Sequence, residues 1–211
     1  MNTNYTAMAL IVDRSGSMHS IASDVKGSVK QLIGDQKKND GKASVTVSQF
    51  DDRYEVVYDF KDIKEIDEAK FAQQYSPRGS TALLDAIGRS TLALSQKLES
   101  IPAAERPNRV VVAVITDGQE NASSEYQLDQ IKKMIKDKTA LGWDFIFMGA
   151  TLDTIEVAKN MGFSVDKSAC YATSKFSSCM QSVSEQITKA RLNKEVKISE
   201  EERTHLTSSA A

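Results

Sequence analysis

The segment Met8–Met18, which reads Met-Ala-Leu-Ile-Val-Asp-Arg-Ser-Gly-Ser-Met, indicates both a fold class and a site. Its first half is apolar and partly β-branched, as in a buried strand, which we expect over residues 7–12. Its second half is polar: Asp13, Ser15 and Ser17 alternate, with a glycine between the two serines. A buried strand that ends in a carboxylate and two hydroxyls favours a loop that holds a cation.

Strand and helix patterns alternate along the rest of the chain. A hairpin is expected over residues 43–60, and the run Val110–Ile115 predicts the central strand. This alternation predicts the α/β class, with a mainly parallel sheet covered on both faces and one antiparallel edge from the hairpin. Further strands are expected at residues 143–148 and 163–169, and helices at residues 21–36, 63–75, 82–98, 126–141, 153–161 and 177–192.

The composition is that of an ordinary soluble protein. The chain has 211 residues, of which 27% are charged, and its formal net charge is −2, so nothing points to nucleic acid as a partner. We see no signal peptide and no apolar run long enough to cross a bilayer, so we expect a cytoplasmic location away from membranes. Two cysteines and two histidines argue against a disulfide framework and a structural zinc site.

Three polar loops are expected at the carboxyl ends of strands, where open α/β sheets bind their ligands. They contain residues 13–17, Thr81 and Asp117, which together offer two carboxylates and three hydroxyls. Such a donor set suits magnesium, manganese or calcium better than zinc or copper. Because neutral hydroxyls are weak donors, the ion would keep water and one replaceable position. An Asp or Glu side chain of a partner protein fits that position.

These residues carry a family resemblance. Asp13-x-Ser15-Gly16-Ser17, the distant Thr81 and the strand-terminal Asp117 are similar to the metal-ion-dependent adhesion site of von Willebrand factor A (VWA) domains. The resemblance covers about residues 5–192. It includes three further stretches that are typical of the family, namely Phe50–Asp52, Gly79–Ile87 and Ile115–Gly118.

The resemblance implies a Rossmann-like, doubly wound sheet of six strands with one antiparallel edge strand. We expect a VWA domain over residues 5–192 and a polar C-terminal tail over residues 193–211, in which Ser199 and Glu202 fit a capping box for one last turn. The strand end at residues 147–151, Phe-Met-Gly-Ala-Thr, is similar to stand-alone intracellular versions from bacteria and their phages.

The resemblance also implies the role of each site residue. Ser15 and Ser17 would coordinate the metal through their hydroxyls, and Thr81 would do so directly or through water. Asp13 and Asp117 would act mostly through water and hydrogen bonds to the serines. The implied ion is Mg²⁺ or Mn²⁺, with Ca²⁺ as the weaker alternative, and the implied function is capture of an acidic side chain of a protein partner.

Two other functions use the same residues differently. A metal-dependent hydrolase or phosphoryl-transfer enzyme would exploit the open metal position. Against it, the sequence has no Walker-type phosphate loop and no clear nucleophile–base pair, and His19 is the only histidine near the site. A purely structural protein would leave the metal site empty in use. We therefore favour a binding module over an enzyme, with its oligomeric state left open.

Several neighbouring residues fit more than one role. Asp85 fits either a second layer around the metal or a carboxylate that favours the start of its helix. Asp51 and Asp52 are interpreted as turn formers, and His19 as an exposed residue at a helix start. The predicted rim, which would set partner choice, consists of Met18, Arg78, Gln119, Glu120 and Asn121.

Overall fold

The computed structural model describes residues 4–150 and 152–208. Its six strands form one sheet in the order β3-β2-β1-β4-β5-β6. Neighbouring strands are parallel except β2 and β3, which form an antiparallel hairpin at one edge. The predicted α/β class and Rossmann-like six-stranded sheet are thereby confirmed. The strands are β1 (Tyr5–Asp13), β2 (Lys42–Phe50), β3 (Tyr54–Asp62), β4 (Arg109–Thr116), β5 (Trp143–Gly149) and β6 (Ser168–Cys170).

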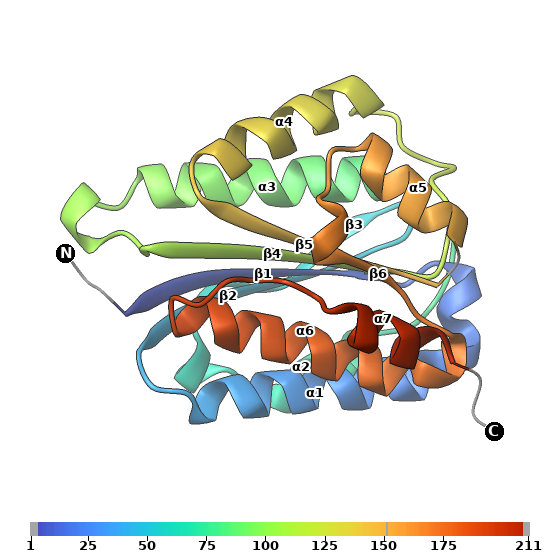
Figure 1. Cartoon of the computed structure of the whole chain (residues 1–211), viewed down its shortest axis with the longest axis horizontal. Coiled ribbons are helices and arrows are strands. Elements are labelled where there is room, and N and C mark those ends of the chain that lie inside the picture. Colours follow the sequence, from blue (N-terminus) through green and yellow to red (C-terminus); the bar gives the residue numbers. More distant parts are fainter. Residues whose placement is uncertain (1–3, 151, 209–211) are drawn as a thin grey trace.

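Helices cover both faces of the sheet, as Figure 1 shows. One face carries α3 (Leu83–Glu99), α4 (Leu128–Ala140) and α5 (Leu152–Asn160). The other face carries α1 (Ala22–Lys38), α2 (Glu68–Gln74), α6 (Phe176–Arg191) and α7 (Glu200–Thr207). Short 3₁₀ helices lie in the connections: η1 (Gly16–Ile21), η2 (Ile63–Glu65), η3 (Ala103–Glu105), η4 (Val165–Lys167) and η5 (Thr173–Lys175).

The two middle strands, β1 and β4, are buried on both faces because their side chains alternate between two cores. On β1, Leu10 and Val12 pack with α1 and α6, whereas Ala9 and Ile11 pack with α3. All nine residues of β1 are buried. Each fully buried aliphatic side chain stabilises the fold by about 1.5–3 kcal/mol, so this strand is fixed firmly in place.

The register of the two middle strands determines where the polar loops emerge. Val12 of β1 pairs with Ile115 of β4 in a parallel ladder, so both strands end at the same edge of the sheet. Asp13 therefore lies beside Thr116, and Asp117 follows at the same edge. Residues that are about one hundred positions apart in the chain become neighbours.

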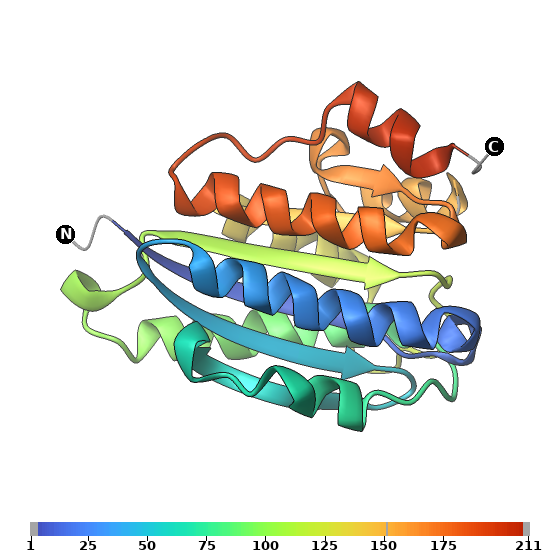
Figure 2. The ribbon, with the colours of Figure 1, turned by 90° about the horizontal axis from the view of Figure 1, so that it is seen from below.

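Helices α1 and α6 lie side by side on one face, as seen in Figure 2, and are joined by buried polar contacts. Gln36 of α1 donates from Nε2 to the carbonyl of Ser184 at 2.9 Å. Arg191, which is buried at the end of α6, donates to four backbone carbonyls at and beyond the end of α1, those of Gln36, Asn39, Asp40 and Gly41. These bonds supply a donor to the carbonyls at the end of α1 and in the turn that follows it, where the helix itself offers few donors.

The segment after α6 was expected to be a polar tail, but much of it packs on the domain. Val196, Ile198 and Leu206 are buried in the core that α1 and α6 share. The predicted capping box is present at the start of α7: the N–H of Glu202 donates to Ser199 Oγ at 3.1 Å, and the N–H of Ser199 donates to Glu202 Oε2 at 2.7 Å. The domain boundary at residue 192 stays a prediction. Parts of our predictions concern residues 209–211 and Thr151. These residues lie outside the described part of the chain.

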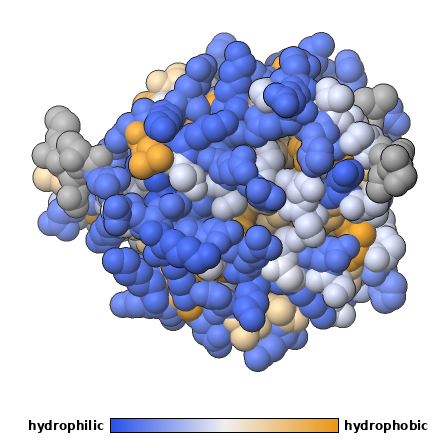
Figure 3. All heavy atoms as spheres, turned by 60° about the horizontal axis from the view of Figure 1, so that its bottom comes forward, coloured by the Kyte–Doolittle hydropathy of each residue, from blue (hydrophilic) through white to orange (hydrophobic). Residues whose placement is uncertain are grey.

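Within residues 4–150 and 152–208, no helix combines the length and apolar character needed to cross a membrane. Figure 3 shows a face whose visible surface is largely hydrophilic, with hydrophobic residues scattered rather than gathered into one patch. This face therefore offers no large apolar docking surface.

Candidate metal centre

All five predicted metal ligands meet at the carboxyl edge of the sheet. Asp13 is the last residue of β1, and Asp117 directly follows β4. Ser15 and Ser17 lie at the start of η1, and Thr81 lies just before α3. The strands are fixed by the core, so the loops that follow them emerge together.

Hydrogen bonds link four of these residues into a chain. The N–H of Ser15 donates to Asp13 Oδ1 at 2.6 Å, and the hydroxyl oxygens of Ser15 and Ser17 are 3.1 Å apart. The hydroxyl of Ser17 donates to Asp117 Oδ1 at 2.5 Å. Asp13 Oδ2 accepts a second bond, from the hydroxyl of Thr116. The oxygen atoms of the two loops are therefore held close together.

Gly118 shows that the fifth residue, Thr81, faces the same point. A methyl group placed on Gly118 would lie 3.0 Å from Thr81 Oγ1, 3.6 Å from Ser17 Oγ and 3.7 Å from Asp13 Oδ2. Oxygens from three separate elements thus surround one small space, which the absence of a side chain on Gly118 leaves open. This cradle of oxygens has the donor chemistry that a hard divalent cation requires.

Burial raises the pKa of both carboxylates. Asp13 is fully buried, and this burial raises its pKa to about 6, although the hydrogen bond from Thr116 acts in the opposite direction. Burial also raises the pKa of Asp117, against the hydrogen bond from Ser17. Two partly desolvated carboxylates beside one small space are costly, and a bound divalent ion would remove that cost.

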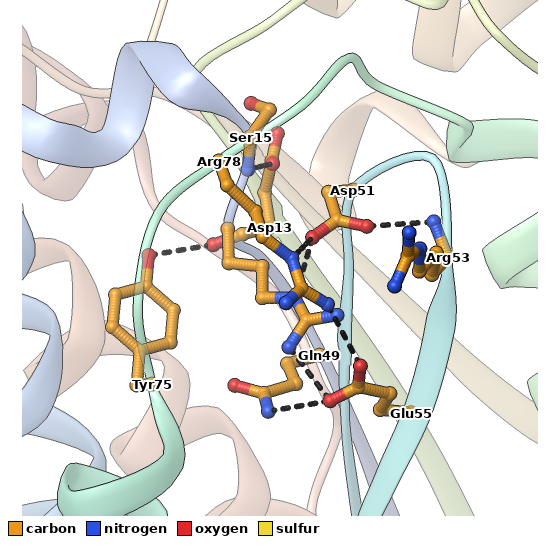
Figure 4. A network of polar contacts seen from close by, with 9 residues as sticks. Asp13, Ser15, Gln49, Asp51, Arg53, Glu55, Tyr75 and Arg78 are labelled. Atoms are coloured by element: carbon orange, nitrogen blue, oxygen red, sulfur yellow. Dashed lines mark hydrogen bonds and ion pairs between the residues drawn. The ribbon is translucent and has the colours of Figure 1, made fainter.

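Two buried tyrosines fix the strand ends from beneath the loops. The hydroxyl of Tyr75 donates to the backbone carbonyl of Asp13 at 2.7 Å (Figure 4). The hydroxyl of Tyr171 donates to the carbonyl of Thr116 at 3.1 Å. Burial raises the pKa of both phenols well above the usual value, so both stay protonated donors. Neither tyrosine was predicted, because each is far in sequence from the residue it contacts.

Thr81 is held by Asn121, which we had interpreted as a rim residue. The N–H of Thr81 donates to Asn121 Oδ1 at 2.8 Å, and the N–H of Asn121 donates to the Thr81 carbonyl at 3.0 Å. This reciprocal pair ties the loop after β4 to the loop before α3. Asn121 therefore supports a candidate ligand directly, in addition to any contact with a partner.

The carboxylates of Glu120 and Asp85 also hold this loop together. Glu120 Oε2 accepts from the N–H of Leu84 at 2.9 Å, in the first turn of α3. Asp85 accepts from the backbone N–H groups of residues 124, 125 and 126 at 2.9–3.0 Å. Neither contact involves a candidate metal ligand; together they tie the loop after β4 to the first turn of α3. Glu120, predicted as a rim residue, is thus engaged by backbone N–H groups within the protein.

Other predicted rim residues differ in their exposure. Met18 is fully buried in the core beside α1, so its placement on the rim was wrong. Its position in η1, one residue after the exposed Ser17, turns it inward. Arg78 and Gln119 are exposed, as expected of the rim, and His19 is exposed, as expected of a residue at a helix start.

Asp51 is more than the turn former that we predicted. It does form the hairpin turn, since its Oδ1 accepts from the N–H of Arg53 at 2.6 Å. It is also fully buried, and its other oxygen contacts the guanidinium groups of Arg14 and Arg78 (Figure 4). A buried carboxylate needs such charged partners.

Hydroxyls and carboxylates together make up this donor set. Within residues 4–150 and 152–208, no group of three or more His, Cys, Asp and Glu side chains is placed to bind a metal. A site of this kind would need three hydroxyls beside its two carboxylates, and that mixture favours hard ions over zinc or copper.

Comparison with known proteins assigns this sequence to a family. A sequence model described as the von Willebrand factor type A domain matches residues 8–186. The chain belongs to the von Willebrand factor type A family. The predicted family is therefore confirmed, whereas the stand-alone bacterial or phage type stays a prediction. No curated protein matches this VWA chain at a significant level.

Solved structures share the VWA fold at low sequence identity. Proximal thread matrix protein 1 from the mussel byssus, in a structure with a zinc-occupied MIDAS (metal-ion-dependent adhesion site) motif, is 21% identical with a TM-score of 0.60; the match covers 88% of this chain and 46% of that one. A von Willebrand factor type A protein from Catenulispora acidiphila is 14% identical with a TM-score of 0.62, covering 88% and 43%. The chain therefore spans less than half the length of these two proteins.

A third VWA structure matches over nearly its whole length. The vWF domain of the type V pili tip protein Mfa5 from Porphyromonas gingivalis is 9% identical with a TM-score of 0.64, and the match covers 92% of this chain and 97% of that one. At such identities the likeness shows the fold alone. The assignment of particular ligands therefore depends on the geometry described above.

Proposed function

We propose that this chain is a divalent-metal-dependent protein-binding module. Asp13, Ser15, Ser17, Thr81 and Asp117 would hold Mg²⁺ or Mn²⁺, and an Asp or Glu of a partner protein would complete the coordination. The observation that supports this proposal most is the cradle around Gly118, where oxygens from three separate elements face one small space. Membership of the VWA family supports the same role.

The protein's own residues would contribute in two ways. The buried carboxylate of Asp13 and the half-buried carboxylate of Asp117 would supply negative charge, while the three hydroxyls supply neutral oxygens. When bound, the ion would provide a positive charge that attracts a carboxylate. Because Ser17 is exposed at the surface while Asp13 is buried, the open side of the site would face solvent and a partner.

We expect the metal's identity from the donor chemistry. Oxygen ligands without nitrogen or sulfur favour Mg²⁺ or Mn²⁺ over zinc, and calcium prefers more oxygens than the five predicted residues offer. The zinc seen in the mussel protein belongs to that protein. Competition of Mg²⁺, Mn²⁺, Ca²⁺ and Zn²⁺ for one calorimetric site would establish the order for this chain.

Partner capture from the native host tests the function. The immobilised full chain would be exposed to lysate with Mg²⁺ or with EDTA, and bound proteins identified by mass spectrometry. Ser17→Ala removes a candidate ligand, whereas Ser20→Ala changes an exposed serine of the same 3₁₀ helix and serves as the matched control. We expect a partner that is lost with EDTA and with Ser17→Ala but retained by Ser20→Ala.

A partner that binds equally well in EDTA would contradict the proposal. Once a partner is identified, replacing its contacting Asp or Glu by Asn or Gln should abolish binding. Fractionation of host cells would test the cytoplasmic location, which stays a prediction.

A further inference from the structure

Two arginines and two carboxylates form a compact ion cluster beside the candidate ligands (Figure 4). Arg14 and Arg78 each place Nε against Asp51 Oδ2, at 2.8 and 2.9 Å. Both also reach Glu55: Arg14 Nη1 lies 2.7 Å from Oε2, and Arg78 Nη2 lies 2.8 Å from Oε1. Each arginine therefore bridges the same two carboxylates.

The cluster joins the two loops that carry serine and threonine ligands. Arg14 stands between Asp13 and Ser15, and Arg78 stands three residues before Thr81. Asp51 and Glu55 come from the hairpin between β2 and β3. Both loops contribute arginines to the cluster, so their charges do not attract each other. The carboxylates of the hairpin pair with both arginines and so hold the two loops together.

Backbone hydrogen bonds follow the same path. The N–H of Arg78 donates to the carbonyl of Arg14 at 2.8 Å, and the N–H of Gly16 donates to that of Gly79 at 3.2 Å. The N–H of Ala82, on the other side of Thr81, donates to the carbonyl of Asp51 at 2.9 Å. The segment that presents Thr81 is thus anchored before and after this residue.

Burial divides the cluster into an inner and an outer pair. Arg14 and Asp51 are 2% and 0% exposed, whereas Arg78 and Glu55 are 47% and 46% exposed. Ion pairs as exposed as the outer one contribute little to stability, because water screens the charges and both side chains must be ordered. The Arg78–Glu55 contact by itself therefore adds little to stability. The bonds from Arg78 to the buried Asp51 and from Glu55 to the buried Arg14 fix the start of the Thr81 loop instead.

We propose that Arg78 and Glu55, built onto the buried Arg14–Asp51 pair, are positioning residues of the metal centre that hold Thr81 in place beside Ser17 and Asp13. This inference rests on the proposed function. A ligand that is already fixed costs nothing to order when a metal binds, so residues that orient ligands raise metal affinity without contacting the ion.

Mn²⁺ calorimetry on the full chain tests the inference. The variants are Arg78→Gln, Glu55→Gln and the double variant, together with Arg78→Lys, which keeps the charge but loses the planar fork. The matched control is Arg89→Gln, which breaks the pair between Arg89 on α3 and Glu125 in the loop before α4, whose side chains are 41% and 47% exposed. Thermal unfolding in EDTA would be measured for each variant as a readout of stability alone.

We expect Arg78→Gln and Glu55→Gln to weaken Mn²⁺ binding about tenfold each, with only a small decrease in the midpoint of unfolding in EDTA, because the buried Arg14–Asp51 pair remains in both variants. The double variant should bind Mn²⁺ as weakly as either single variant and no weaker, because the two side chains act as a unit. Arg78→Lys should recover part of the affinity, and Arg89→Gln should bind like the wild type.

Unchanged Mn²⁺ affinity in Arg78→Gln and Glu55→Gln, with or without a lower midpoint in EDTA, would overturn the inference while leaving the proposed function intact. A wild-type chain that binds no Mn²⁺ would overturn both. The two failures are therefore distinguishable in one set of titrations.

Discussion

Ser17 donates its hydroxyl hydrogen to Oδ1 of Asp117 across 2.5 Å, although 100 residues separate the two in the chain. One lies in the turn after β1 and the other directly follows β4. The bond exists because these two strands pair in parallel and end at the same edge of the sheet. It joins a neutral donor to a half-buried carboxylate, the arrangement expected of a ligand and the group that orients it.

Replacing Asp13 by asparagine should stabilise the metal-free protein at neutral pH while abolishing metal binding. The carboxyl of Asp13 has a pKa of about 6 when folded against 3.8 when unfolded. Between these values the folded state binds more protons, so the free energy of unfolding decreases as pH rises and stays reduced above pH 6. The amide of the variant carries no charge to bury, and we expect Asp13→Asn to gain about 1–3 kcal/mol at pH 7.5.

Urea unfolding in EDTA between pH 4 and pH 7.5 would measure this effect. The difference in unfolding free energy between Asp13→Asn and wild type should be smallest at pH 4 and grow toward pH 7. A difference that does not vary with pH would show that Asp13 does not titrate in this range.

Adding a methyl group at Gly118 should lower metal affinity with the ligands themselves unchanged. The new carbon would stand 3.0 Å from Thr81 Oγ1 and within 4 Å of oxygens of Ser17 and Asp13, so it would occupy the cradle. Titration of Gly118→Ala with Mn²⁺ checks this expectation. Gly27→Ala is a suitable control, because nothing lies within 4 Å of the methyl group it would add. Wild-type affinity in Gly118→Ala would place the metal elsewhere.

Truncation of Asn121 should weaken metal binding by about tenfold, since this side chain holds the backbone of Thr81 at 2.8 Å. Asn121 is exposed, so the stability of the metal-free protein should change by less than about 1 kcal/mol. Calorimetry of Asn121→Ala beside Gln119→Ala, an exposed neighbour in the same loop, separates the two effects. Equal affinity in both variants would argue that Thr81 needs no support from Asn121.

Arg191 should matter for stability but not for metal binding. Its buried guanidinium satisfies four backbone carbonyls around the end of α1. Arg191→Met would remove the side-chain donor from all four carbonyls, and we expect a loss of about 2–4 kcal/mol in the free energy of unfolding. Chemical denaturation checks the loss, and Mn²⁺ affinity at low temperature should match that of the wild type. A variant as stable as wild type would show that water replaces the guanidinium.

The sequence was sufficient to predict the sheet and the convergence of the five candidate ligands. β-branched runs predicted the strands, and Asp13 and Asp117 stand where strands end, so the parallel topology brought them together. It was not sufficient for residues that act through the fold. Asn121 and Tyr75 contact partners that are 40 and 62 positions away, and no local spacing encodes such pairs.

Two other differences have a similar cause. Met18 follows a polar loop and was placed on the rim, yet the 3₁₀ turn directs it into the core. The segment after α6 contains few apolar residues, so its pattern indicated a polar tail. Val196, Ile198 and Leu206 are nevertheless buried, because they pack into the same core as the apolar residues of α1 and α6.

The central claim is that the five residues form one divalent-metal site, and Mg²⁺ titration of wild type and Asp117→Ala by calorimetry tests it most directly. Wild type should bind one Mg²⁺ per chain and show a higher midpoint of thermal unfolding with the metal than with EDTA. Asp117→Ala should remain folded and lose both effects. The absence of heat and of any thermal shift in the wild type, or equal binding by the variant, would contradict the claim.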